Sequence, residues 1–241
     1  MLVLAVETST LTGSVALMQS PPDGKTPKII GEHILNLEST HSRQLMPSLD
    51  HLLQEASLSI REVEGIALAL GPGSFTGLRI GVSTVKGLAY ALKVPVAGVP
   101  TLDGLARNIS FPSPLICAVL DARKKEVFAA LFRFKDGEGE LKKLSPDWVL
   151  PPRDLCTRIN EETIFVGNGV EVYGDLFRRE LGPLALFAPP ELCLPRASNI
   201  ARLSLSKFKA GQTLDLFSFT PVYIRRSDAE VHFKGKEPQG I

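Results

Sequence analysis

LALGPGSFTGLRIGVSTVKGLAYAL, residues 68–92, decides the fold of this 241-residue chain. The stretch begins inside an apolar run typical of a buried strand, passes through a glycine-rich turn, and continues with the periodicity of a helix. Another apolar run, residues 94–99, predicts a second strand. Strand, turn, helix and strand in this order form a crossover unit with parallel strands, which predicts an α/β protein with mixed sheets flanked by helices.

The segments before this unit predict a small antiparallel meander followed by a helix. Residues 2–9 read as a buried strand, residues 14–20 as its hairpin partner, and residues 28–37 as a third strand. Ser39 or Thr40 can cap a helix that runs towards Ala56, because leucines recur there on one face.

The segments after the unit repeat the opening plan. Residues 111–134 again contain two apolar runs joined by a polar turn, which suggests two related halves. We therefore expect a first lobe over residues 1–109 and a second lobe over residues 110–196. Residues 197–241 are expected to form a closing helix and a tail that pack back on the first lobe.

Composition excludes several classes of protein. The chain is 44% hydrophobic with a net charge of +1, so it can bury a sizeable core but has no global field to attract nucleic acid or an anionic membrane. Cys117, Cys156 and Cys193 lack the spacing of zinc sites or disulfide scaffolds and are expected to be reduced thiols. No basic leader and no apolar run long enough to span a bilayer occur, which predicts a cytoplasmic protein.

Two turns could hold an anion. Residues 7–9 end the first strand, and the turn that follows residue 70 opens a helix whose first N–H groups could bind phosphate. The candidate phosphate-loop residues are Glu7, Thr8, Ser9, Gly71, Gly73 and Ser74. The glycine-rich turn matches neither a P-loop nor a dinucleotide fingerprint, and it can equally be a tight structural turn. Residues 7–9 can equally be a hairpin whose hydroxyls bond their own backbone.

The helix after the glycine-rich turn carries a stripe of small residues. Gly77, Gly81 and Thr84 share one face, flanked by Leu88, and leave the backbone nearly bare. Each interior glycine costs about 0.5–1 kcal/mol relative to alanine, a cost that close packing of another helix would offset. The stripe is therefore a candidate interface with a partner or a second copy, although a neighbour within the same lobe fits equally well.

The sequence contains no motif typical of a metal site or of a catalytic nucleophile. The four histidines form no helical ligand pair and are expected at the surface; they are His33, His41, His51 and His232. The charged turn at Asp121–Glu126 is expected to be a solvated hairpin tip. No nucleophile elbow is present.

Five stretches together resemble one known family. They are AVETSTLTGSVAL (residues 5–17), residues 68–92, VPVAGVPTLDGLA (94–106), DARKKEVFAALF (121–132) and PVYIRR (221–226). These resemble the TsaB (YeaZ) family over essentially the whole chain, most loosely between about residues 137 and 194. The resemblance implies the two-lobed actin/hexokinase/heat-shock-chaperone-like (ribonuclease H-like) fold.

The resemblance also implies a function without catalysis. TsaD, a related subunit of the same fold, transfers a threonylcarbamoyl group to adenine in tRNA and binds its metal partly through a His-x-x-x-His pair. Here Thr101 and Leu105 stand where those histidines belong, and neither can replace an imidazole ligand. The family pattern therefore implies no metal site and no tightly bound cofactor in this chain, with ATP and metal acting through TsaD and TsaE.

The same resemblance predicts the partners. TsaD would bind through the helices of the first lobe, TsaE would join a larger assembly, and the chain alone would form a homodimer. Contact with tRNA, in which adenosine 37 of tRNAs reading ANN codons is modified, would come only through the complex, and no membrane is involved. The main alternative is an ATP-dependent small-molecule kinase or nucleotidase that uses Glu7, Ser9 and the two polar turns around ATP. A peptidase lacks any supporting motif.

Overall fold

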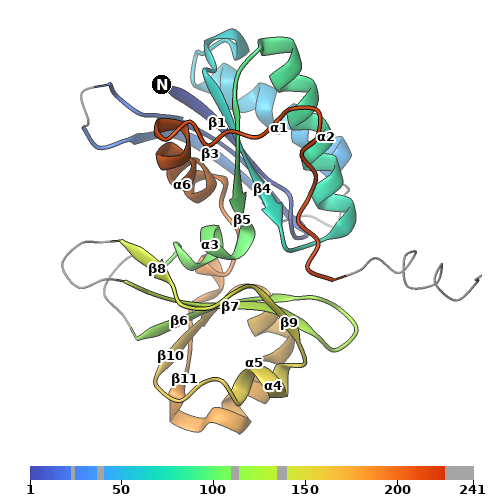
Figure 1. Ribbon diagram of the computed structural model, residues 1–241, viewed down its shortest axis with the longest axis vertical. Coiled ribbons are helices and arrows are strands. Elements are labelled where there is room, and N and C mark those ends of the chain that lie inside the picture. Colours follow the sequence, from blue (N-terminus) through green and yellow to red (C-terminus); the bar gives the residue numbers. More distant parts are fainter. Residues whose placement is uncertain (23–24, 37–40, 110–113, 135–139, 226–241) are drawn as a thin grey trace, which may run out of the picture.

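The computed structural model describes residues 1–22, 25–36, 41–109, 114–134 and 140–225, which form two lobes, one above the other in Figure 1. The predicted caps Ser39 and Thr40 and the predicted boundary at residue 110 lie outside the described residues. The strands are β1 (Leu2–Glu7), β2 (Thr12–Gln19), β3 (Lys28–Asn36), β4 (Gly65–Gly71), β5 (Val96–Pro100), β6 (Leu115–Asp121), β7 (Val127–Phe134), β8 (Leu141–Lys143), β9 (Trp148–Leu150), β10 (Thr163–Val166) and β11 (Ala185–Phe187). The helices are α1 (His41–Glu55), α2 (Phe75–Leu92), α3 (Thr101–Ala106), α4 (Pro152–Cys156), α5 (Gly169–Leu181) and α6 (Ala197–Lys209), with short 3-10 turns η1 (Ile60–Glu62), η2 (Gly182–Leu184) and η3 (Pro190–Leu192).

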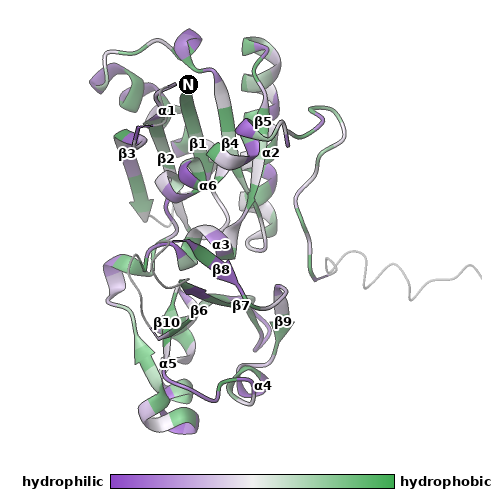
Figure 2. Ribbon diagram, turned by 60° about the vertical axis from the view of Figure 1, so that its left-hand side comes forward, coloured by the Kyte–Doolittle hydropathy of each residue, from purple (hydrophilic) through white to green (hydrophobic). Residues whose placement is uncertain are grey.

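The first lobe is built on a five-stranded mixed sheet in the order β3-β2-β1-β4-β5. β1 pairs antiparallel with β2 and parallel with β4, and all six residues of β1 are buried. Helices α1 and α2 cover one face of the sheet, and α6 covers the other. The central strands β1 and β2 are coloured as hydrophobic in Figure 2, as two-sided burial requires.

The second lobe repeats the arrangement of the first. β6 pairs antiparallel with β7 and parallel with β10, as β1 does with β2 and β4, in a sheet ordered β11-β10-β6-β7-β8, with β9 also pairing with β7. Helices α4 and α5 pack on one face of this sheet, where Phe165 stacks on Phe177 at a centroid distance of 4.6 Å. The two halves are therefore alike in topology.

Helix α3 differs from the expected partition of the chain. Residues 1–109 are predicted to belong to the first lobe, yet Leu102 and Leu105 are fully buried against the sheet of the second lobe, where they contribute to its core with Ile116 and Phe132. The helix therefore forms the contact layer between the lobes (Figure 1). Local sequence could not reveal this placement, because the partner residues come later in the chain.

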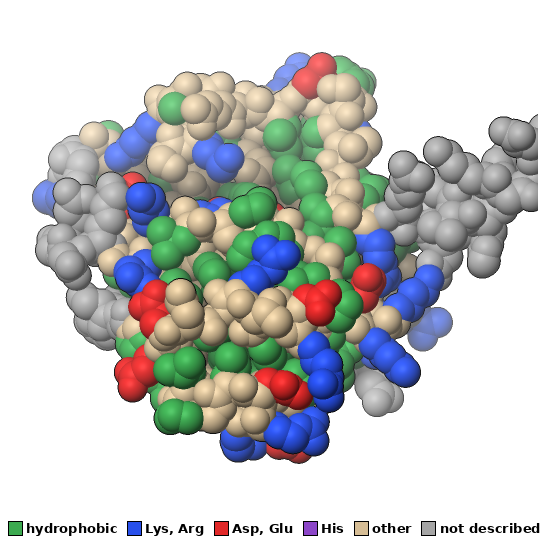
Figure 3. Space-filling model, turned by 60° about the horizontal axis from the view of Figure 1, so that its bottom comes forward, with side chains coloured by type: hydrophobic (Ala, Val, Ile, Leu, Met, Phe, Trp, Pro, Cys, Tyr) green, Lys and Arg blue, Asp and Glu red, His purple; other side chains and the backbone are tan. Residues whose placement is uncertain are grey.

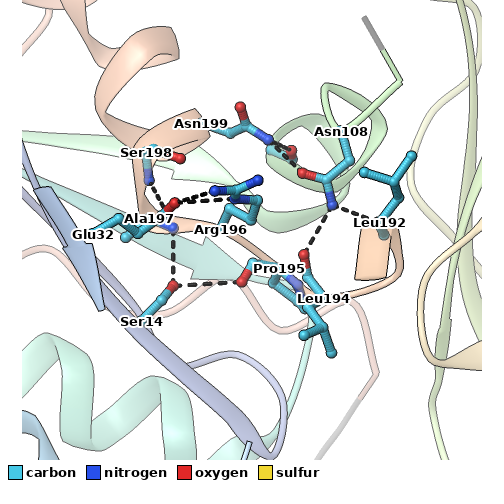
Figure 4. Close-up of polar contacts among 11 residues, drawn as sticks. Ser14, Glu32, Asn108, Leu192, Leu194, Pro195, Arg196, Ala197, Ser198 and Asn199 are labelled. Atoms are coloured by element: carbon cyan, nitrogen blue, oxygen red, sulfur yellow. Dashed lines mark hydrogen bonds and ion pairs between the residues drawn. The ribbon is translucent and has the colours of Figure 1, made fainter. Parts of the chain in front are cut away.

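Helix α6 is held against the first sheet by polar contacts at its N-terminus (Figure 4). The backbone N–H of Ala197 donates to Ser14 Oγ at 2.9 Å, and the N–H of Ser198 donates to Glu32 Oε1 at 2.8 Å. Glu32 Oε2 also accepts from Nε and Nη2 of Arg196, at 3.0 and 2.7 Å. Side chains of β2 and β3 thus satisfy the first N–H groups of a helix that begins more than 160 residues later.

The two chain segments that cross between the lobes are tied together by an asparagine pair (Figure 4). Asn108 donates through Nδ2 to the carbonyl oxygens of Leu192 and Leu194, at 2.6 and 2.9 Å. Asn199 Nδ2 donates to Asn108 Oδ1 at 2.7 Å and to the Gly104 carbonyl at 3.0 Å. The outgoing and returning crossings are thereby fixed to each other.

The inner face of α2 carries the small residues that the sequence suggested as a partner interface. Gly77 and Gly81 are buried, and the Thr8 hydroxyl donates to the Gly77 carbonyl at 2.8 Å. A Cβ at Gly81 would overlap that hydroxyl and press on Leu68. The prediction that these two glycines meet a partner is therefore wrong: the bare backbone receives β1 and β4 of the same lobe. Helical spacing shows which residues share a face but not what covers that face.

The other two residues of the stripe are only half-buried. Leu88 packs on the core of the first lobe, and Thr84 lies beside it at the edge of the covered face. The exposed side of α2 instead carries Thr76, Ser83 and Gly87. At Gly87 a Cβ would meet nothing within 4 Å.

Two glycine substitutions in the same helix should therefore act in opposite directions. We expect Gly81→Ala to lower the free energy of unfolding by about 1–3 kcal/mol, because the methyl group overlaps Thr8. We expect Gly87→Ala to raise it by up to about 1 kcal/mol, because alanine favours the helix and has open space. Urea unfolding of both variants beside the wild type measures the difference, and a Gly81→Ala variant as stable as the wild type would contradict the packing.

Candidate functional site

A cavity of about 490 Å³ lies between the two lobes, within the size range of small-molecule sites. Its first-lobe wall consists of residues 9–11 and 72–76, and its second-lobe wall of residues 121–123 with Phe128 and Asn168. Residues 222–225 complete the lining. The cavity therefore joins five stretches that are far apart in the sequence.

The first-lobe wall brings together two turns that the sequence proposed for anion binding. The N–H of Ser74 donates to the Ser9 carbonyl at 2.6 Å, and a Cβ at Gly73 would overlap that same carbonyl. Ser74 then caps α2, because its Oγ accepts from the Gly77 N–H at 3.2 Å. Glycine is required at position 73 by this close approach of two backbones. Ser9, Gly73 and Ser74 all line the cavity.

The other three predicted phosphate-loop residues do not line it. Thr8 is fully buried, and its hydroxyl donates a hydrogen bond to the Gly77 carbonyl. Gly71, at a φ of +113°, packs its α-carbon against the Val222 carbonyl. Glu7 is buried beneath the hairpin. The predicted six-residue loop is thus half cavity wall and half supporting core.

Glu7 carries the most perturbed carboxyl group of this region. Burial raises its pKa to about 7, although an N–H···O hydrogen bond from Ser9 favours the charged form. Its Oε2 has no hydrogen-bond partner among the described residues. A carboxyl group that is half protonated near neutral pH and lies outside the cavity lining is a poor ligand for Mg²⁺ there.

The second-lobe wall is the hairpin between β6 and β7. The N–H of Asp121 donates to Asn168 Oδ1 at 3.0 Å, and Asp121 Oδ1 accepts from the Arg123 N–H at 2.9 Å. The three basic residues Arg123, Lys124 and Lys125 have positive φ angles and exposed side chains, as a solvated hairpin tip requires. Asp121 points inward and Arg123 borders the cavity, so the tip also closes it.

The C-terminal strap, residues 214–225, crosses the cavity from one lobe to the other. It runs beside α2 in Figure 1, and the N–H of Val222 donates to the Leu70 carbonyl at 2.8 Å. The centroids of the Tyr223 and Phe75 rings are 5.0 Å apart, and Arg79 Nε donates to the Tyr223 hydroxyl at 3.0 Å. Arg225 then reaches the second lobe, donating to the Ala122 carbonyl at 2.6 Å. In the sequence, PVYIRR is noted only as part of the family resemblance, which did not reveal that residues 222–225 line the cavity.

The two positions that the family resemblance sets against the relative's histidines are buried. Thr101 and Leu105 are both 0% exposed in α3, and Leu105 is part of the second-lobe core. Thr101 Oγ1 has no hydrogen-bond partner among the described residues. No group of three or more His, Cys, Asp or Glu side chains in the described parts of the chain is placed to hold a metal ion.

Two observations bear on the surface of the molecule. No helix in the described part of the chain is long and apolar enough to cross a membrane. On the face turned forward in Figure 3, basic and acidic side chains are interspersed rather than gathered by sign. This agrees with the net charge of +1.

Two lobes of matching topology, with a cavity between their first hairpins, define the class of actin-like two-lobed proteins. The family model "TsaD: tRNA N6-adenosine threonylcarbamoyltransferase" matches residues 28–233. The chain is 30% identical to the tRNA threonylcarbamoyladenosine biosynthesis protein TsaB of Bacillus subtilis, over 95% of this chain and 96% of that protein. It is also 30% identical to the Escherichia coli protein of the same name, over 98% and 100%.

A solved structure agrees with these relatives. YeaZ from Pseudomonas aeruginosa superposes with a TM-score of 0.76 at 29% identity, covering 92% of this chain and 99% of that one. This chain belongs to the TsaB (YeaZ) family, and the resemblance that its motifs predicted is confirmed.

The buried carboxyl group of Glu7 should make stability depend on pH in a defined direction. Its pKa is about 7 in the folded chain against 4.5 as the ordinary value, so folding keeps a proton that the unfolded chain releases. The stabilisation is therefore fully present below about pH 4.5 and is lost as the pH rises through about 7. Over that pH range the free energy of unfolding of the wild type should fall by up to about 3 kcal/mol more than that of Glu7→Gln, because glutamine cannot ionise.

Urea unfolding of both proteins at about pH 4 and pH 8 tests this, because all other titrating groups are shared and cancel in the comparison. If the two proteins differed in free energy of unfolding by the same amount at both pH values, Glu7 would not be buried in its protonated form.

Proposed function

We propose that this chain is a non-catalytic subunit that binds TsaD and supports the transfer of a threonylcarbamoyl group to adenosine 37 of tRNAs that read ANN codons. Its family relatives carry names from tRNA threonylcarbamoyladenosine biosynthesis. In this proposal TsaE joins the assembly, ATP and metal act through TsaD and TsaE, and no cofactor binds this chain tightly. The site of action is the cytoplasm, and tRNA is reached only through the complex.

The observation that carries the proposal is the burial of Thr101 and Leu105. Metal-assisted transfer needs first-shell ligands that face the substrate and keep one coordination position open. In this chain, the two positions that correspond to the relative's histidines hold a threonine and a leucine, both without exposed surface. A leucine side chain has no ligand atom, and here it is part of the contact layer between the lobes.

The outer surface of the first-lobe helices supports the partnership with TsaD. Met46 on α1 and Tyr90 on α2 are 47% and 67% exposed, and Phe217 of the strap is 79% exposed beside Tyr90, at a ring distance of 6.4 Å. Exposed aromatic and methionine side chains are enriched at protein interfaces. In the proposal this surface binds TsaD, and in the absence of TsaD it binds a second copy of the chain.

The cavity between the lobes favours a second candidate, an ATP-dependent small-molecule kinase or nucleotidase. Ser9, Ser74 and Asp121 line a space of about 490 Å³ between two polar turns. The burial of Glu7 weighs against this activity, because the first-lobe wall then has no carboxylate to hold Mg²⁺ there. Calorimetry with ATP and Mg²⁺ separates the candidates: micromolar binding with turnover by the lone chain would favour the kinase.

The purified chain should not modify tRNA by itself. Incubated with ATP, threonylcarbamoyl-adenylate and tRNA, it should give no modified adenosine by mass spectrometry, whereas addition of TsaD and TsaE should produce it. Omission of this chain from the complete mixture should reduce the yield strongly. Modification without TsaD, or full activity without this chain, would overturn the proposal.

A bulky residue on the exposed face of α2 should weaken the complex without unfolding the chain. Gly87→Leu places a side chain where nothing lies within 4 Å, so the melting temperature should stay the same or rise. Affinity for TsaD should fall roughly 5-fold to 150-fold, the equivalent of about 1–3 kcal/mol of overpacking.

Titration against TsaD and analytical ultracentrifugation measure the two associations. Ser206→Leu, at an exposed position on α6, is the matched control and should change neither. Unchanged affinity of a folded Gly87→Leu variant would place the interface on another surface.

A further inference from the structure

A second cavity lies at the junction of the lobes and shares no residue with the first. Its volume is about 320 Å³, and it is lined by Met18, Pro27, Ile29, Arg107, Phe134, Ser198, Asn199 and Arg202. We call it the back cavity. It combines an apolar wall from β2, β3 and β7 with a polar wall from the end of α3 and the first turns of α6.

The polar wall contains two arginines that no carboxylate neutralises. Among the described residues neither Arg107 nor Arg202 forms an ion pair. The neighbouring cations do: Arg196 is bound by Glu32, and Lys143 by Asp103 and Asp147 at 2.6 Å each. The two arginines of the back cavity therefore differ from Arg196 and Lys143, whose charges are compensated.

This arrangement is unfavourable for the empty protein. The pKa of Arg107 is lowered first by burial and second by the charge of Arg202, so the two guanidinium groups repel each other across a partly desolvated space. The hydroxyl of Ser198, a residue only 4% exposed, has no hydrogen-bond partner among the described residues either. An anion between the arginines would remove the repulsion and supply acceptors for their N–H groups.

We propose that the back cavity binds the phosphate group of a nucleotide, either free or within an RNA chain. Two planar guanidinium groups present paired N–H donors that match phosphate oxygens, and the Ser198 hydroxyl adds a third donor. The apolar wall of Met18, Ile29 and Phe134 offers surface for the rest of the nucleotide, and its low dielectric strengthens the field of the arginines. The RNA source rests on the proposed function and deepens it: there tRNA reaches this chain as a member of the assembly, and the back cavity would be the place where the chain itself contacts it.

The test compares charge-removing variants with a matched control. Arg107→Gln, Arg202→Gln and the double variant remove the proposed contacts, while Arg179→Gln removes an equal charge from an exposed position on α5. The probes are AMP, inorganic phosphate and unmodified tRNA at low salt, with affinities measured by calorimetry and by fluorescence anisotropy. Melting curves confirm that each variant folds.

Each arginine substitution should weaken binding about tenfold and the double variant more, whereas Arg179→Gln should match the wild type. If the arginine variants bind AMP and phosphate more weakly than the wild type does, the ligand is a free nucleotide. Weakened binding of tRNA alone identifies RNA. Wild-type affinity of a folded double variant for all three probes, or no binding of any probe by the wild type, would overturn the proposal.

The same variants separate this inference from the proposed function. Binding to TsaD is measured for each of them in parallel. If the arginine variants bind every probe as the wild type does while the chain still activates TsaD, only the back-cavity proposal fails. If the wild type binds AMP through these arginines but does not support threonylcarbamoyl transfer, only the proposed function fails.

Discussion

The capping of helix α6 by Ser14 and Glu32 is the interaction on which the rest of the structure depends. These side chains bind the first N–H groups of a helix that covers an alanine-rich face of the first sheet, with Ala5, Ala16 and Ala67 buried beneath it. Small side chains allow the helix to lie close to the sheet, so its N-terminus must be placed accurately. The asparagine pair next to it fixes both crossings between the lobes and hence the spacing of the two cavities.

The cavity between the lobes keeps the geometry of a ligand site while the residues around it favour a structural role. Its first-lobe turns are joined backbone to backbone through Ser9 and Ser74, and its second-lobe hairpin presents Asp121 and Arg123. The carboxyl group of Glu7 lies below, where burial raises its pKa to about 7, and the strap reaches from one lobe to the other. In the proposed function this architecture serves as the rigid support of a partner, since a fold does not determine the chemistry that it carries.

The parts of the fold that are local in sequence could be predicted. The strand and turn before α2, the hairpin of β1 and β2, and the helix at Ala197–Lys209 follow from apolar periodicity and glycine-rich turns. The packing of Gly81 could not be predicted, because its contact is Thr8, more than 70 positions away, and periodicity does not say which face meets the sheet. Nor could the sequence show that Thr8 and Gly71 lie behind the cavity wall, because the residues that contact them come much later in the chain. Arg107 and Arg202 belong to no motif and become neighbours only through the return of α6.

The return of helix α6 also constrains the order in which this molecule can form during its synthesis. All five strands of the first sheet are complete by Pro100, but the helix that covers one face of that sheet ends at Lys209. Between those points the ribosome must produce the whole second lobe, while Val3, Ala69 and Val99 remain without their cover. The second lobe also receives α3 from the earlier half, so it can close first. The N-terminal half of the chain is therefore the last to become fully native, the reverse of the usual order in which domains fold as they emerge.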